Sequence, residues 1–345
     1  MNAGIVGYGV YVPRFRIKRD EYLKAWGNFS ARGVEEKALP GLDEDAVTMA
    51  VESSGNALKR AEIVASALNG IFFASTSSPY SEKLSSSTVV ASLNGPSEIF
   101  LADVGFSTKA GTTAVMSCLD FVASGRADLG LAVASDVPRA MPTDPLEHGF
   151  GAGSASFVVG KNNAIATVEG THSSSLEIIG ERYRRNGHGY VRDSGISGYT
   201  EQAFNQAVSI SVTGLLKNLK VRAEEFAHVI FQQSDGRSPY EIGRKLGFRD
   251  SQISHSMTVT KIGDAGCASA LIGLCAVLDM ARSGERILVA SYGAGAGSDS
   301  ISLVTTERIG ERRNDAPSLE DYLEKKEYVD YVTYLKFKRM LGLRQ

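Results

Sequence analysis

The amino-acid sequence predicts an α/β fold built from two similar halves. Short apolar segments of strand length alternate with longer segments of helical periodicity along the chain. One Gly-rich unit occurs twice, and 43% hydrophobic with 22% charged residues over 345 positions is the composition of a compact protein with a large core. Alternating elements of this kind predict a sheet whose central strands are buried.

The repeated unit has four parts in the same order: a Gly-rich segment, an apolar helix, a Ser-Gly turn and a strand. A Gly/Ala/Ser run follows each copy. The Gly-rich segments, turns, strands and final runs lie at 107–114, 124–125, 131–135 and 149–155 in the first copy, and at 263–270, 283–284, 287–291 and 293–298 in the second. A repeat this long predicts two subdomains packed face to face, because a solenoid needs several shorter repeats.

Strands are predicted where short apolar runs are bounded by turn-forming residues, and helices where apolar residues recur at helical spacing. The strands are at 4–10, 70–75, 99–103, 129–134, 155–159, 165–171, 228–232, 286–291 and 301–305. The helices are at 45–61, 86–93, 112–123, 201–219, 240–246 and 269–282.

Three regions follow from this order: an N-terminal half at 1–164, a C-terminal half at 165–310, and a C-terminal extension at 311–345. The extension is charged and becomes amphipathic from 319 to 343, which predicts a peripheral helix or helix pair. The segment 182–192 is rich in Arg, Gly and Tyr and is predicted to be an exposed loop. Its charges form either a solvated face or a basic loop that contacts phosphate groups beside a cleft.

Charge and composition exclude several classes of protein. A formal net charge of -2 gives no general footprint for nucleic acid. The longest apolar runs are too short to span a bilayer, and the first residues lack the charged start of an export signal, so a cytoplasmic protein is expected. Three cysteines are too few for a disulfide framework, and their spacing offers no metal site.

The cysteines differ in their surroundings. Cys118 and Cys275 lie within apolar helical patterns, which favours small buried thiols. Cys267 opens a helix directly after a glycine, where backbone N–H groups and the helix dipole can lower a thiol pKa. Cys267 is therefore either a core residue or a nucleophile.

Five segments together resemble the archaeal-type 3-hydroxy-3-methylglutaryl-CoA synthases of the thiolase superfamily. They are Gly4–Pro13, Ser78–Tyr80, Lys109–Thr112, Asp144–Glu147 and Ser291–Asp299, in order along residues 1 to about 340. The resemblance implies a five-layered α-β-α-β-α thiolase fold with duplicated halves, a dimer, and an acyl-CoA thioester held between the halves. It implies no covalently bound cofactor and no metal.

The resemblance also implies where the chemistry should lie, and there the residues differ. Members of this family use a cysteine that carries the acyl group, a glutamate that moves the proton and an assisting histidine. The matching positions here are Thr108, Thr76 and Gln232, and Asp264 stands where the family has an asparagine. A hydroxyl is a weaker nucleophile than a thiol, and an amide is no acid or base.

Three interpretations of these positions remain open. Thr76, Thr108 and Gln232 can simply line a satisfied polar pocket. Asp264 can be the base of a noncovalent acyl-CoA reaction in which Thr108 or Gln232 binds the thioester oxygen. Cys267, which the repeat places at the start of the second-half helix as Thr108 is at the start of the first, can be a displaced nucleophile.

Coenzyme A contacts are expected after the strand that precedes Gln232. Arg237, Arg244 and Lys245 offer positive groups for nucleotide phosphates there, or are ordinary surface charges. At a further family contact, Ala294 replaces a serine.

Two classes of function follow. The first is a non-catalytic subunit of a Claisen- or thiolase-type acyl-CoA system, paired with a catalytic thiolase-like chain and with a zinc-ribbon/OB-fold protein that binds the coenzyme, since relatives of the synthase work in such complexes. The second is a divergent acyltransferase or Claisen-type lyase that acts on an unusual acyl-CoA and uses Asp264, Thr108 or Cys267. Whether the chain forms a homodimer or a heteromer with a catalytic thiolase-like chain stays open.

Overall fold

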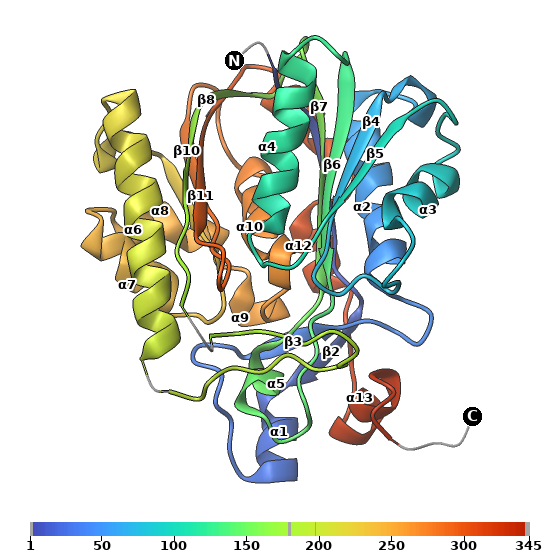
Figure 1. Ribbon diagram of the computed structural model, residues 1–345, viewed down its shortest axis with the longest axis vertical. Coiled ribbons are helices and arrows are strands. Elements are labelled where there is room, and N and C mark those ends of the chain that lie inside the picture. The colour runs from blue at the N-terminus through green and yellow to red at the C-terminus, as the bar shows by residue number, and fades with distance from the viewer. Residues whose placement is uncertain (1–2, 179–180, 197, 342–345) are drawn as a thin grey trace.

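The alternation of strands and helices is confirmed by a computed structural model, which describes residues 3–178, 181–196 and 198–341 (Figure 1). The strands are β1 Gly4–Tyr11, β2 Phe15–Lys18, β3 Glu36–Leu39, β4 Gly70–Ala74, β5 Phe100–Val104, β6 Leu129–Asp136, β7 Gly153–Gly160, β8 Ala166–Ser174, β9 His228–Phe231, β10 Arg286–Ala290, β11 Ser298–Thr305 and β12 Glu327–Tyr328. The helices are α1 Arg19–Trp26, α2 Ala46–Ala61, α3 Ser85–Ser92, α4 Ala110–Ala123, α5 Pro145–Gly149, α6 Tyr199–Leu219, α7 Ser238–Lys245, α8 Asp250–Ile253, α9 Val259–Ile262, α10 Ser269–Leu278, α11 Ile309–Arg312, α12 Leu319–Glu324 and α13 Tyr331–Phe337.

The large sheet contains the duplication that the sequence predicts. Its order is β5-β4-β6-β7-β1-β8-β11-β10-β9. In the first half β4 is parallel to β6, and β6, β7 and β1 are successively antiparallel. In the second half β9 is parallel to β10, and β10, β11 and β8 are successively antiparallel. A short pairing of Gly4 and Ile5 with Thr167 and Ala166 joins the halves.

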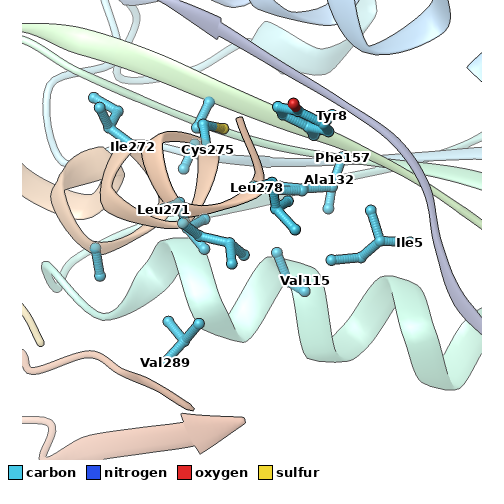
Figure 2. Close-up of a cluster of buried hydrophobic side chains, with 14 of the residues drawn as sticks. Ile5, Tyr8, Val115, Ala132, Phe157, Leu271, Ile272, Cys275, Leu278 and Val289 are labelled. Carbon is cyan, nitrogen blue, oxygen red and sulfur yellow. The ribbon is translucent and has the colours of Figure 1, made fainter. Parts of the chain in front are cut away.

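The elements form five layers. Helices α2 and α3 cover the outer face of the first half, α6, α7 and α8 cover that of the second, and α4 and α10 lie between the two halves of the large sheet (Figure 1). The central layer forms the main core, where Val115 of α4 and Leu271 of α10 pack with Phe157 and Val289 (Figure 2). Cys275 belongs to this cluster, and all three cysteines are free and buried.

Local sequence explains why the longest N-terminal helix begins where it does. Asp45 caps α2 by accepting from the N–H groups of Val47 at 2.8 Å and Thr48 at 2.9 Å, while the Thr48 hydroxyl accepts from the Asp45 N–H at 2.8 Å. This reciprocal capping box satisfies backbone donors that a helix start leaves unpaired. No helix in the described part of the chain is long and apolar enough to cross a membrane.

A small second sheet, of order β12-β2-β3, lies beside the large one. It brings the C-terminal extension against the N-terminal half, since β12 pairs with β2. Tyr331 and Tyr334 of α13 pack with Tyr22 of α1 in one buried cluster. Leu319 and Leu323 of α12 join the main core. The extension does contain the predicted helix pair, and these side chains are integrated into the body.

Candidate active site

The candidate site lies where parallel strands of both halves end. Thr76 follows β4, Asp136 ends the neighbouring β6, Gln232 follows β9 and Tyr292 follows β10. Strand β4 is parallel to β6, and β9 is parallel to β10. Because the carboxyl ends of parallel strands share one edge of a sheet, the chain brings these side chains to one end of the molecule.

Asp136 accepts most of the hydrogen bonds at this end of the molecule, and the sequence did not indicate it as a site residue. Its carboxylate is fully buried and accepts hydrogen bonds from the Thr76 N–H and hydroxyl, both at 2.8 Å, and from the Cys267 N–H at 2.8 Å. The hydroxyls of Ser75 and Ser77 donate to it at 3.1 and 2.6 Å. The Thr76 side chain is therefore committed to supporting a buried carboxylate.

Gly266 begins the 3-10 turn that leads into α10 and contacts Asp136 directly. Its φ is +57°, and a Cβ there would lie 2.2 Å from the Asp136 Oδ2. The Gln232 side-chain amide donates to the Gly266 carbonyl at 2.8 Å, and the Gly266 N–H donates to Asp264 Oδ1 at 2.8 Å. Only glycine fits this left-handed, crowded position without displacing its neighbours. One turn thus connects Asp136, Gln232 and Asp264.

Gln232 is buried, with 4% of its surface exposed. Because its NH2 group faces the Gly266 carbonyl, the orientation of the amide is fixed by hydrogen bonding. Its oxygen Oε1 is buried and has no hydrogen-bond partner among the described residues. A buried unpaired acceptor is costly and marks a position where a ligand can contribute a donor.

Asp264 forms an ion pair that the sequence did not predict. Arg182 donates from Nη1 to Asp264 Oδ2 at 2.7 Å, and Asp264 is only 2% exposed. The Arg182 guanidinium also lies 4.6 Å from the centre of the Phe150 ring. Both carboxylate oxygens are engaged, because Oδ1 accepts from Gly266. Each oxygen of the Asp264 carboxylate thus has a donor in the scaffold.

Arg182 belongs to a segment, residues 181–192, that we call the strap. Arg184 donates to the Thr76 carbonyl at 2.6 Å, so the strap contacts the first half through Arg184 and the second through Arg182. The Tyr292 hydroxyl donates to the Glu181 carboxylate, and burial raises the pKa of Glu181. The prediction of an exposed loop at 182–192 is therefore right for Arg184 and Arg185 and wrong for Arg182 and Val191.

Thr108 lies beside the second Gly-rich run. Its hydroxyl donates to the Tyr292 carbonyl at 2.7 Å, and its surface is 8% exposed. A Cβ on Gly293 would come within 1.8 Å of the Ser107 hydroxyl oxygen, so the two segments approach as closely as glycine permits. A backbone carbonyl cannot take up the Thr108 proton, and this contact therefore does not activate the hydroxyl as a nucleophile.

The expectation of a lowered thiol pKa at Cys267 is wrong. Burial and the neighbouring Asp136 carboxylate raise the pKa of Cys267 well above its ordinary value. Its side chain is 2% exposed, and the thiol donates to the Ala74 carbonyl at 3.4 Å. The helix start contributes through the Cys267 N–H, which binds Asp136. Desolvation raises the pKa of Cys267 by more than the helix terminus lowers it. This supports the interpretation of Cys267 as a core thiol.

An ion pair joins the two halves next to Thr108. Lys109 donates to Asp299 Oδ1 at 2.8 Å, and Asp299 is 2% exposed. The Asp299 carboxylate also accepts from the hydroxyls of Thr112, Thr113 and Ser173, at 3.1, 3.0 and 2.8 Å. The Lys109-Ala-Gly-Thr motif is thus held in place by the strand that follows the second Gly-rich run.

The predicted coenzyme contacts lie on the outside of the second half. Arg237 is exposed at the start of α7. Arg244 is exposed and paired with Asp250 at 2.5 Å. Lys245 borders a surface hollow of about 470 Å³, together with Gly198, Glu201, Gln202, Asn205 and Gln206. Ala294 is half-buried in the Gly-rich run beside Thr108.

The structure therefore divides the predicted site residues into three groups. Thr76, Gln232, Asp264 and Cys267 meet around the Gly266 turn through the hydrogen bonds given above. Ala294 lies on the adjoining second Gly-rich run and Thr108 lies beside it, and Gly111, one turn after Thr108, packs against the Cys267 carbonyl. Arg244 and Lys245 lie on α7, and Arg237 directly precedes it. The described residues contain no cluster of His, Cys, Asp and Glu that could hold a metal ion.

Comparison with known proteins identifies the family. The chain is 40% identical over 343 residues to the hydroxymethylglutaryl-CoA synthase of Methanopyrus kandleri, covering 98% of this chain and 97% of that one. It is 37% identical over 347 residues to that of Methanocaldococcus jannaschii, covering 99% and 100%. No protein-family model matches the chain.

Solved structures share the fold. MvaS in complex with 3-hydroxy-3-methylglutaryl coenzyme A has a TM-score of 0.88 at 19% identity, with 99% of this chain and 92% of that chain covered. The 3-oxoacyl-[acyl-carrier-protein] synthase III of Aquifex aeolicus has a TM-score of 0.75 at 20% identity, with 88% and 99% covered. The chain has the thiolase fold and belongs to the hydroxymethylglutaryl-CoA synthase family.

Proposed function

We propose that this chain is an acyl-CoA-binding subunit of a Claisen- or thiolase-type carbon–carbon bond forming or cleaving system, and that it performs no condensation itself. It pairs with a catalytic thiolase-like chain. The observation that carries the proposal is that the side chains at the expected reactive positions are bound to the scaffold. Condensation needs a nucleophile, a base and a proton donor that are free to react.

Each position supports this interpretation separately. The Thr108 hydroxyl donates to a backbone carbonyl. Thr76 donates to Asp136, and Gln232 donates to Gly266. Asp264 is paired with Arg182. These four residues provide no alkoxide, no free carboxylate and no imidazole. In this proposal they therefore cannot carry out acyl transfer by the family's usual chemistry.

Ligand binding is the part of the family's function that the chain retains in this proposal. A solved relative is described in complex with 3-hydroxy-3-methylglutaryl coenzyme A, and another with CoA. On this chain Arg237, just before α7, and Lys245, at the end of α7, are exposed cations, and Lys245 borders the hollow described above. Such groups suit the phosphates of a coenzyme A thioester.

A partner surface is supported by the edge of the first half. Strand β5 is the last strand of the sheet, and its outer edge is unpaired among the described strands. Phe100 on β5 is 42% exposed, and Phe106, just after it, is completely exposed with φ at +69°. Exposed strand edges and large apolar side chains favour association. We propose that a second copy or, in the favoured assembly, a thiolase-like chain covers this edge, with a zinc-ribbon/OB-fold protein as a further component.

The test is the intact mass of the purified chain after incubation with acetyl-CoA, acetoacetyl-CoA and longer acyl-CoA thioesters, with and without a thiolase-like chain encoded beside it. We expect an acyl adduct on the partner and none on this chain. Peptide mapping that places an adduct on Thr108 or Cys267 would instead make this chain a divergent acyltransferase. Turnover without any adduct, abolished by Asp264→Asn, would identify Asp264 as a base and would also contradict the subunit role.

A further inference from the structure

A hollow of about 380 Å³ lies at the end of the large sheet opposite the candidate active site, and we call it the basal hollow. Leu129, which lines it, begins β6, whereas Asp136 at the candidate site ends the same strand. The other walls are the start of β1, the end of α2, the turn after β7 and the segment that contains α11. The basal hollow thus contacts both the first half and the chain that follows the last strand of the second half, and it shares no residue with the candidate active site.

One cation of the basal hollow lacks an anion, although three cations and two carboxylates line it. Arg312 is paired with Glu62. Lys161 is paired with Asp128 at 2.8 Å, so both carboxylates are occupied. Arg308 has no ion pair among the residues that the structure describes, and its nitrogen Nε is buried without a hydrogen-bond partner there. An unpaired buried donor on a charged group is costly, and its presence in a folded chain indicates a missing partner.

An apolar wall lies beside this cation. Val6 is buried, and Ala61, Ile63 and Leu129 are half-buried at the edge of one hydrophobic cluster. All four residues line the basal hollow. Ligand sites commonly combine an apolar surface with a few polar groups that fix the orientation of the ligand, and a volume of this size accommodates a small molecule. One free guanidinium beside an apolar wall therefore indicates an organic anion.

The charge of the basal hollow decides which anion fits. Its charged residues leave a net charge of +1, and helix α2 ends there at Ala61, so that the negative end of the helix dipole faces the hollow. Both features disfavour a phosphate monoester, which carries almost two charges at neutral pH. A carboxylate carries one charge and matches the forked geometry of a guanidinium. We propose that the basal hollow binds a small carboxylic acid as its carboxylate, with the charged group on Arg308 and the carbon chain against Ile63 and Leu129.

The experiment is calorimetric titration of the full-length chain, at constant ionic strength, with hexanoate, acetate, hexanamide and inorganic phosphate. Acetate lacks the carbon chain, and hexanamide lacks the charge. We expect hexanoate to bind about tenfold more tightly than each of the others, because it alone contacts both the guanidinium and the apolar wall. At a tenfold excess over its Kd, hexanoate should raise the thermal midpoint by about 3 °C. Absence of saturable hexanoate binding, or tighter binding of inorganic phosphate, would overturn the inference.

Variants locate the binding site. Arg308→Met removes the unpaired guanidinium and should weaken hexanoate about tenfold, to the affinity of hexanamide. Arg282→Met, at an exposed arginine outside the hollow, is the matched control and should leave the Kd of hexanoate unchanged. Ile63→Ser shortens the apolar wall and should weaken hexanoate while the affinity for acetate stays unchanged. Thermal melting without ligand should show no loss of stability in Arg308→Met, because the variant removes an unpaired group.

The same titrations separate the basal hollow from the acyl-CoA site proposed above. Hexanoate that binds Arg308→Met as tightly as the wild-type chain occupies another site, and this result would overturn the inference. Displacement of hexanoate by CoA would do the same, because the two proposed sites share no residue. Hexanoate binding that persists at saturating CoA and weakens in Arg308→Met supports the inference. A thermal midpoint lowered by more than about 4 °C in ligand-free Arg308→Met would contradict it, since the guanidinium would then have a structural partner.

Discussion

Breaking the ion pair between Lys109 and Asp299 should destabilise the chain far more than breaking a surface pair of the same length. Lys109 and Asp299 are 2.8 Å apart with side chains 19% and 3% exposed. Lys161 and Asp128 are also 2.8 Å apart, but their side chains are 33% and 85% exposed. Methionine at either lysine keeps the aliphatic stem and removes the charge, so the two variants differ chiefly in the burial of the carboxylate left behind.

The expected magnitudes follow from burial. Removing one partner of a buried pair costs about 3 to 5 kcal/mol, and we take about 3 kcal/mol because Lys109 is partly exposed and Asp299 keeps three hydroxyl donors. An exposed pair contributes about 0.5 kcal/mol. At about 2 °C per kcal/mol for a chain of this size, the thermal midpoint should fall by about 6 °C in Lys109→Met and by about 1 °C in Lys161→Met.

Thermal unfolding followed by circular dichroism measures both shifts under one condition. The double variant Lys109→Met/Asp299→Asn should recover part of the loss, because it removes the uncompensated buried charge. Equal shifts in the two single variants would refute the argument from burial. A double variant with the summed loss of its single changes would show that packing, not charge, holds this junction.

Four further outcomes are expected. Thr108→Cys alone should form no hydroxymethylglutaryl-CoA, because Thr76 and Gln232 remain without a carboxylate and an imidazole; measurable product would show that these positions were misjudged. Cys267 should resist iodoacetamide in the native chain and react after unfolding, and rapid native alkylation would contradict the raised pKa. Burial lowers the pKa of His148 to about 4, so on acidification the unfolded chain binds a proton at His148 before the folded chain does, and stability should be lost as the pH falls from 6.5 to about 4. The thermal midpoint of His148→Asn should fall less over this range. Parallel curves of midpoint against pH for the two proteins would exclude His148 as the cause. Phe106→Asp should weaken association at the β5 edge at least tenfold in analytical ultracentrifugation, and an unchanged association constant would place the interface elsewhere.

The strands of the large sheet were predictable because each is a short apolar segment that can be recognised from its own residues. The segment 286–291 was expected as a strand and β10 spans Arg286–Ala290; the segment 112–123 was expected as a helix and α4 spans Ala110–Ala123. The helix predicted at 269–282 is four residues too long, because α10 ends at Leu278.

The small sheet was missed because its cause is not local. Strand β12 has two residues and pairs with β2, more than 300 positions earlier in the chain. Strand β3, of four residues, is almost entirely buried although it contains Glu36 and Lys37. Short strands with charged residues carry a weak signal, and their pairing depends on tertiary packing.

The sequence indicated which residues lie near one another at the candidate site, but not which hydrogen bonds and ion pairs they form. The resemblance indicated Thr76, Gln232 and Asp264, and these do meet at one turn. Asp136 was missed although it lies only two residues beyond the predicted end of its strand. Arg182 was missed because an arginine in a basic loop gives no sign of which carboxylate it will contact. The sequence placed Cys267 at a helix start, but the burial that reverses its pKa shift comes from the packing of both halves.

The side chains at the reactive positions are also the supports of the site. Thr76 holds Asp136, Asp136 holds the Cys267 N–H, Gln232 holds the Gly266 carbonyl, and Asp264 holds the Gly266 N–H. Replacing any of them by a catalytic group removes a hydrogen bond from a buried turn, at a cost of about 1 to 3 kcal/mol for each unpaired group. If the chain performs no condensation, as we propose, a gain of that activity requires several simultaneous changes, because the atoms that a catalytic group would replace also support the turn.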